Sequence, residues 1–169
     1  MDYRTEPLGQ VMEALRSMPA FLRDAALRFP KNAALASGPA GGFGFVEQVW
    51  HLADLEVEGY GLRIDRILKE DHPALADFDG AQVAGDRQYR SLSLADGLAR
   101  FAEARARNLG ALVEIVPSQW KRTGVQTGVG TVRLSDLPRM MAEHDASHRE
   151  EIRELLGETL SGTERSGVA

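Results

Sequence analysis

Two histidines, His144 and His148, stand four residues apart in a stretch with helical spacing. On a helix, side chains four residues apart lie one above the other on the same face. The intervals of three or four between apolar residues mark this face as core-facing, and its members are Leu134, Leu137, Met141, His144, His148, Ile152 and Leu155. Because buried polar groups cost free energy unless they are satisfied, the pair either binds a metal ion or forms hydrogen bonds within the core.

A third imidazole, His51, lies on another predicted helix. If the two helices pack side by side, three neutral imidazoles could bind one metal ion and leave a coordination position for water or substrate. That arrangement is typical of catalytic metal sites. Zn²⁺, Ni²⁺ and Fe²⁺ all accept imidazole, so the identity of the divalent metal stays open. Carboxylates often orient such ligands, and the candidates are Asp54, Glu143 and Asp145.

Two other interpretations compete with a catalytic metal site. Histidines can be purely structural, satisfied here by hydrogen bonds that they donate to the carboxylates of Glu47, Asp54 or Glu143. The spacing of the pair also matches the His-Glu-x-x-His pattern of metalloproteases, in which the glutamate is the general base. Asp145 occupies the glutamate position and is one methylene shorter. We therefore do not expect a protease.

Four helices are predicted to position these residues, over residues 7–29, 45–70, 93–116 and 135–157. Pro19 is expected to kink or split the first of them. The connection 74–92 is long enough to cross over one end of a bundle, and residues 118–133 fit a small hairpin or an ordered loop. The predicted fold is an all-α four-helix bundle with a long crossover connection, in a single domain of residues 1–157. A disordered tail is expected over residues 158–169.

Composition narrows the class of protein. The 169 residues are 43% hydrophobic and 27% charged, with a net charge of −5 and no cysteine. The arginines form no basic stripe, which argues against a nucleic-acid partner. No apolar run reaches the roughly 20 residues of a membrane span, and no secretory signal is evident, so we expect a cytoplasmic protein without membrane attachment. Two arginine-rich clusters are expected to form solvated helix faces with weak ion pairs: Arg63/Asp65/Arg66 and Arg100/Glu103/Arg105/Arg107.

Three segments, taken in order, resemble the DinB/YfiT-like superfamily. The stretch 49–56 around His51 is similar to its first metal-binding segment, and the stretch 141–148 to its last-helix His-x-x-x-His motif. Between them, residues 120–125 and 130–134 resemble the loop that leads into the fourth helix. The chain departs from relatives at Gln126, so substrate specificity cannot be transferred to it.

The resemblance implies an up-down-down-up four-helix bundle and a divalent metal bound by His51, His144 and His148. It also implies a homodimer. A small-molecule substrate is implied as well, because relatives include S-transferases and maleylpyruvate isomerases that depend on low-molecular-weight thiols. The leading hypothesis is a metal-dependent thiol S-transferase or a related hydrolase, whose catalytic residues beyond the metal ligands are unknown. The alternative is a non-catalytic helical bundle that is either a stress-associated metal-binding protein or a protein-interaction module.

Overall fold

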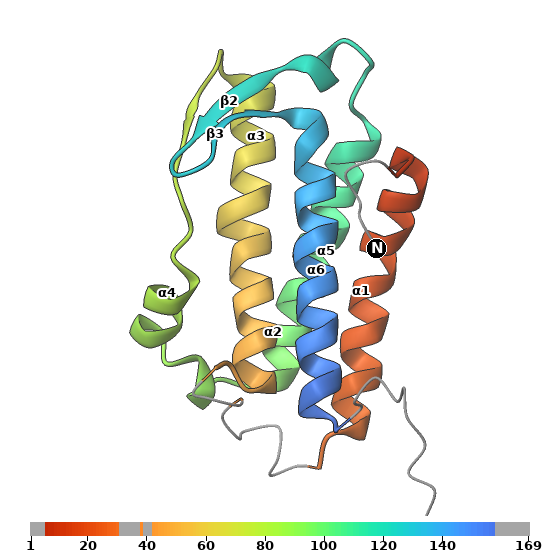
Figure 1. Ribbon diagram of the computed structural model, residues 1–169, viewed down its shortest axis with the longest axis vertical. Coiled ribbons are helices and arrows are strands. Elements are labelled where there is room, and N and C mark those ends of the chain that lie inside the picture. The colour runs from red at the N-terminus through yellow and green to blue at the C-terminus, as the bar shows by residue number, and fades with distance from the viewer. Residues whose placement is uncertain (1–5, 31–37, 39–41, 158–169) are drawn as a thin grey trace, which may run out of the picture.

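The bundle consists of four helical rods, and the computed structural model describes residues 6–30, 38 and 42–157 of the chain (Figure 1). The second rod is compound: α2 continues into a π-helical segment, Leu55–Gly61, and then into α3. The rods are α1 (Leu8–Arg28), α2 (Phe45–Asp54) with α3 (Leu62–Lys69), α5 (Leu94–Val113) and α6 (Leu137–Leu155). The four predicted helices are therefore present, and the predicted tail lies outside the described residues.

Local sequence signals account for several helix ends. Ser93 caps α5, because its Oγ accepts a hydrogen bond from the backbone nitrogen of Asp96 at 3.3 Å. Pro138 lies in the first turn of α6, where a missing backbone N–H costs no helical hydrogen bond. Helix α1 is a single helix that contains Pro19, so the proline does not split it, and the expected kink stays a prediction.

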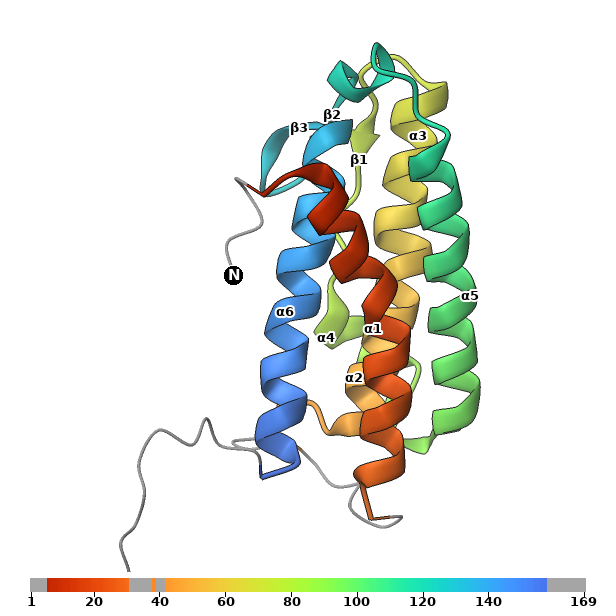
Figure 2. The same ribbon diagram turned by 90° about the vertical axis from the view of Figure 1, so that its right-hand side faces the viewer.

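The rods have the up-down-down-up arrangement. In Figures 1 and 2, the α2–α3 rod and α5 run in one direction, while α1 and α6 run in the other. Two successive rods can be parallel because the connection between α3 and α5 returns along the outside of the bundle (Figure 1). Helix α2 packs against both α5 and α6, and α1 packs against the same two helices from the other side. This topology brings His51 on α2 next to α6.

The crossover connection contains more structure than expected. It begins with strand β1 (Ala74–Leu75) and continues through α4 (Gly80–Asp86) and a 3-10 turn, Tyr89–Ser91. The predicted hairpin is present as β2 (Thr123–Gln126) and β3 (Gly130–Arg133), which pair antiparallel. Strand β1 adds to β2 in parallel. Two residues are too short for a period-two pattern, so no sequence signal marked β1 as a strand.

The core contains apolar side chains from all four rods, and it also contains charged residues that we predicted to be solvated. Arg105 is 1% exposed and Arg63 is 5% exposed, so the expectation of solvated helix faces is wrong at both positions. Arg66, Arg100 and Arg107 do form exposed or partly exposed ion pairs.

Within the described residues, no helix is both long and apolar enough to cross a membrane.

Candidate metal centre

Three imidazole nitrogens converge between α2 and α6. Nε2 of His144 lies 3.3 Å from Nε2 of His51 and 3.1 Å from Nε2 of His148. One ligand nitrogen from each of the three rings lies within 4.8 Å of the others. The four-residue spacing places His144 and His148 on successive turns of α6, and the packing of α2 against α6 adds His51. The structure thus brings together all three sequence-predicted site residues.

The spacing of these nitrogens fits a divalent metal ion. Zinc binds histidine nitrogen at about 2.0–2.1 Å, and tetrahedral geometry then separates two ligand nitrogens by roughly 3.3–3.4 Å. The two measured separations, 3.1 Å and 3.3 Å, are close to that value. Three ligands of this kind leave one tetrahedral position for water or substrate.

The environment keeps the imidazoles neutral, as metal ligands must be. Burial lowers the pKa of His144 to about 2, and the neighbouring rings of His148 and His51 act in the same direction. Burial likewise lowers the pKa of His148 to about 3. The pKa of His51 is also lowered by burial, against the opposing effect of Glu151 and Asp54. Each ring can therefore offer a nitrogen lone pair at neutral pH.

Gln48 fixes the protonation pattern of His148. Its amide nitrogen donates to the Glu151 carboxylate at 2.5 Å, so its amide oxygen faces the buried Nδ1 of His148 and accepts a hydrogen bond from it. With the proton on Nδ1, Nε2 of His148 carries the lone pair and points toward the other two rings. Sequence reasoning missed Gln48, although a glutamine three residues before His51 on the same helix face was the available signal.

Aromatic rings surround His51. The ring of Phe43 lies 5.5 Å from the His51 ring, and that of Phe78 lies 6.0 Å from it, between centroids. The Tyr60 ring approaches His144 edge-on at 6.3 Å. Nδ1 of His51 is buried and has no hydrogen-bond partner within the described part of the chain. On its Nδ1 side, the His51 ring is therefore held by packing and not by a hydrogen bond.

Two predicted orienting carboxylates have other partners. Asp54 accepts hydrogen bonds from Tyr89 at 2.8 Å and from Arg100 at 2.9 Å, and it also binds Arg87. Asp145 binds Arg105 through both carboxylate oxygens, at 2.6 Å and 3.0 Å. The interpretation of these two residues as direct partners of the histidines is wrong, and the role of Glu143 stays a prediction.

A buried charge network occupies the core beside the histidines. Arg105 donates to both oxygens of Glu56 at 2.8 Å and 3.0 Å, in addition to Asp145. It also donates to the backbone oxygen of Leu15 at 3.0 Å. This guanidinium joins the second, third and fourth rods to α1. Because Asp145 directly follows His144, the network restrains the backbone that carries a candidate metal ligand.

The π-helical segment begins four residues after His51 and contains Glu56 and Tyr60. π-Helical turns often occur at functional sites. Here the Asn108 side chain donates to the backbone oxygen of Glu56 at 2.8 Å, which satisfies a carbonyl in the wider turn. Gly61 is required beside it, because a Cβ there would lie 2.9 Å from Oδ1 of Asn108 and 2.9 Å from the Glu56 backbone oxygen. The apolar periodicity of residues 45–70 does not distinguish such a segment from an ordinary α-helix.

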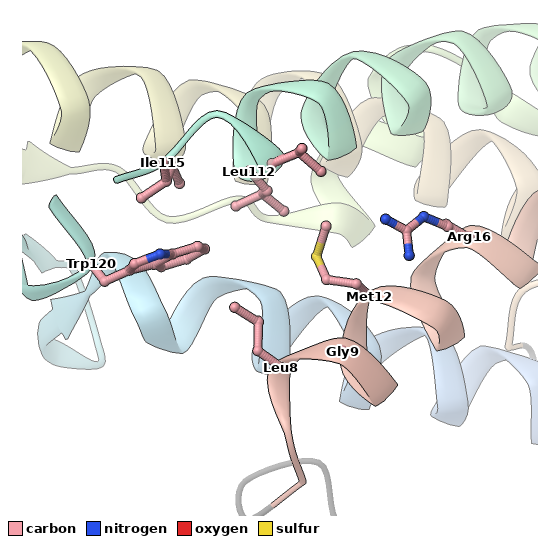
Figure 3. Close-up of a pocket in the computed structure, with 8 residues that line it drawn as sticks. Leu8, Gly9, Met12, Arg16, Leu112, Ile115 and Trp120 are labelled. Atoms are coloured by element: carbon pink, nitrogen blue, oxygen red, sulfur yellow. The ribbon is translucent and has the colours of Figure 1, made fainter. Parts of the chain in front are cut away.

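Two cavities differ in their relation to this site. A cavity of about 190 Å³ lies beside it and is lined by Phe43, Gln48 and Glu151, among others. A larger one of about 370 Å³ lies between the start of α1 and the end of α5, where Met12, Leu112 and Trp120 face it (Figure 3). None of the three histidines lines either cavity, but two residues of the smaller one contact them: Gln48 is hydrogen-bonded to His148, and the Phe43 ring packs against His51. The smaller cavity is therefore the better candidate for access to the metal centre.

The bundle and the histidine cluster define a candidate metal-binding four-helix protein, and comparison with known proteins supplies its family. Residues 11–152 match the DinB superfamily, and the chain belongs to that superfamily. No functionally curated protein gives a significant match.

Solved structures share the fold. YfiT from Bacillus subtilis, described as a probable metal-dependent hydrolase with an unusual four-helix bundle topology, is 22% identical to this chain. It aligns over 87% of this chain and 84% of its own length, with a TM-score of 0.80. A mycothiol-dependent maleylpyruvate isomerase is 14% identical and aligns over 90% of this chain and 63% of its own length, with a TM-score of 0.71. At these identities the likeness shows the fold alone.

Proposed function

We propose that this protein is a divalent-metal-dependent enzyme in which His51, His144 and His148 are the metal ligands. The observation that carries the proposal is the convergence of three Nε2 atoms, two of whose separations, 3.1 Å and 3.3 Å, suit a tetrahedral ion. The solved structure of YfiT, a probable metal-dependent hydrolase with the same fold, supports it.

The reaction we propose is transfer of a low-molecular-weight thiol to an electrophile, or hydrolysis at the same centre. A bound divalent metal lowers the pKa of a coordinated water or thiol and so supplies a nucleophile near neutral pH. The protein's own residues hold the three rings neutral, fix the Nε2 lone pair of His148 through Gln48, and surround His51 with the apolar rings of Phe43 and Phe78. The mycothiol-dependent isomerase with this fold supports the thiol alternative.

Metal content and turnover test this proposal together. Purified protein is loaded with Zn²⁺ or Ni²⁺ and analysed by elemental analysis beside His144→Ala and His148→Ala. We expect about one equivalent of metal in the wild type and little in either variant. Absence of metal uptake by the wild type under replete conditions would refute the proposal.

Turnover then separates the two reactions. Conjugation of monochlorobimane with bacillithiol, mycothiol and glutathione tests S-transfer, in which a C–S bond forms, chloride leaves and the thiol proton passes to water. A panel of esters and amides tests hydrolysis. We expect metal-dependent activity in one panel, lost in both histidine variants. Full metal occupancy without turnover in either panel would favour the non-catalytic metal-binding bundle.

A homodimer is also proposed, and sedimentation equilibrium tests it.

A further inference from the structure

The crossover connection packs directly against His51. Helix α4 begins at Gly80, and this residue faces the edge of the His51 ring that carries Cε1 and Nδ1. A Cβ added at Gly80 would lie 2.5 Å from Nδ1 of His51, whereas non-bonded heavy atoms normally pack at roughly 3.5–4.0 Å. Only glycine allows α4 and the His51 ring to occupy their present positions together.

The connection is anchored on both sides of Gly80, so it cannot easily move away from the ring. Before it, Arg63 donates to the backbone oxygen of Ala76 at 3.2 Å. After it, the Tyr89 hydroxyl donates to Asp54 at 2.8 Å, and Arg87 binds Asp54 as well. Asp54 lies three residues after His51 on the same helix. The segment is thus tied back to the helix that carries the ligand.

We propose that Gly80 is a positioning residue for the metal centre. By admitting α4 against the ring edge, it fixes His51 with Nε2 directed at Nε2 of His144, 3.3 Å away. His148 is oriented by its hydrogen bond to Gln48, but Nδ1 of His51 has no such partner within the described residues. The close approach of α4, together with the ring of Phe78, takes the place of that hydrogen bond. This inference rests on the proposed metal binding by the three histidines.

A matched pair of variants tests it. Gly80→Ala adds a methyl group against His51. Gly85→Ala adds one in the same short helix, where, apart from the chain neighbours and the helix's own backbone, no atom of the described residues lies within 4 Å. Zn²⁺ affinity is measured by competition with a chromophoric chelator, and Co²⁺ absorption reports the ligand geometry. We expect Gly80→Ala to weaken Zn²⁺ binding at least about tenfold, as loss of an orienting contact does, and to change the Co²⁺ spectrum. Gly85→Ala should remain within about twofold of the wild type.

A stability cycle on metal-free protein tests the contact itself. Gly80→Ala should lower the urea midpoint, and adding His51→Ala should restore part of that loss, because removal of the imidazole leaves room for the methyl group. Equal Zn²⁺ affinity and equal Co²⁺ spectra for Gly80→Ala and Gly85→Ala would overturn the proposal, and so would strictly additive effects in the cycle. If the wild type bound no metal, the proposed function would fail, while the cycle would still report on the contact between Gly80 and His51.

Discussion

The amide oxygen of Gln48 on α2 and Nδ1 of His148 on α6 form a buried hydrogen bond, and the Gln48 amide nitrogen donates to the Glu151 carboxylate at 2.5 Å. This bond keeps the Nε2 lone pair of His148 available. We predict that Gln48→Leu, which preserves size but removes the acceptor, weakens Zn²⁺ affinity about 10–100-fold. Chelator competition measures the change.

The control for this prediction is Gln10→Leu, because Gln10 is exposed on α1. This variant should bind Zn²⁺ as the wild type does. An unchanged affinity in Gln48→Leu would mean that the hydrogen bond to His148 does not tune the site.

Arg105 is predicted to be essential for stability. Arg105→Met leaves Glu56 and Asp145 buried without their cation, and breaking a buried ion pair in this way costs about 3–5 kcal/mol. Arg107→Met is the matched control on the same helix: the Arg107 side chain is 60% exposed and pairs with Glu103. That change should alter the free energy of unfolding by less than about 0.5 kcal/mol. Urea denaturation measures the free energy of unfolding of both variants. Equal, small losses in the two would contradict the prediction that the buried network of Arg105 stabilises the fold.

Acid should destabilise the metal-free protein through the histidine cluster. The folded-state pKa values of His144 and His148, about 2 and about 3, lie below the usual 6.5, so the unfolded chain binds more protons as the pH falls. The stability contributed by the neutral rings is complete above pH 6.5 and is lost progressively below it, by up to about 1.4 kcal/mol per pH unit for each ring. Urea midpoints between about pH 7.5 and about 4.5 measure this loss.

The double variant His144→Leu/His148→Leu gives the comparison for the acid effect. Its stability should fall less steeply below pH 6.5 than that of the wild type, because neither leucine takes up a proton. Identical slopes for the two proteins would assign the acid loss to other groups.

Metal should stabilise the folded protein, because the three histidines converge only when α2 and α6 are packed together. Free Zn²⁺ at about one hundred times its dissociation constant should add about 2.7 kcal/mol to the free energy of unfolding. Thermal melts with added Zn²⁺, and again after chelation, measure the effect. A stabilisation that persists in His51→Ala with His148→Ala would show that the metal binds elsewhere.

The helices and the histidine set were predictable because each leaves a periodic or spaced pattern in the sequence. Apolar residues at helical intervals located the four rods, and His144 and His148 shared a face through their spacing alone. The resemblance to the DinB superfamily supplied the packing that adds His51, and the matched residues 11–152 confirm that family.

The partners of charged residues were not predictable in the same way. Arg105 and Arg107 are two residues apart on α5, so their side chains point to different faces of the helix. The Arg105 guanidinium enters the core because Glu56 and Asp145, from two other rods, face it there. Gln48 acquires its role only from the packing of α2 against α6. The closeness of Gly80 to His51 depends on the path of a connection without a strong sequence period. These contacts join residues far apart in the chain, and a single sequence contains no record of such pairs.

A crystal structure of the protein loaded with Zn²⁺, with anomalous diffraction collected at the zinc edge, tests the central claim most directly. The account predicts one strong anomalous peak about 2.0–2.1 Å from Nε2 of each of His51, His144 and His148. It also predicts a fourth ligand from solvent. A peak away from the three rings, or coordination that excludes His51, would contradict it.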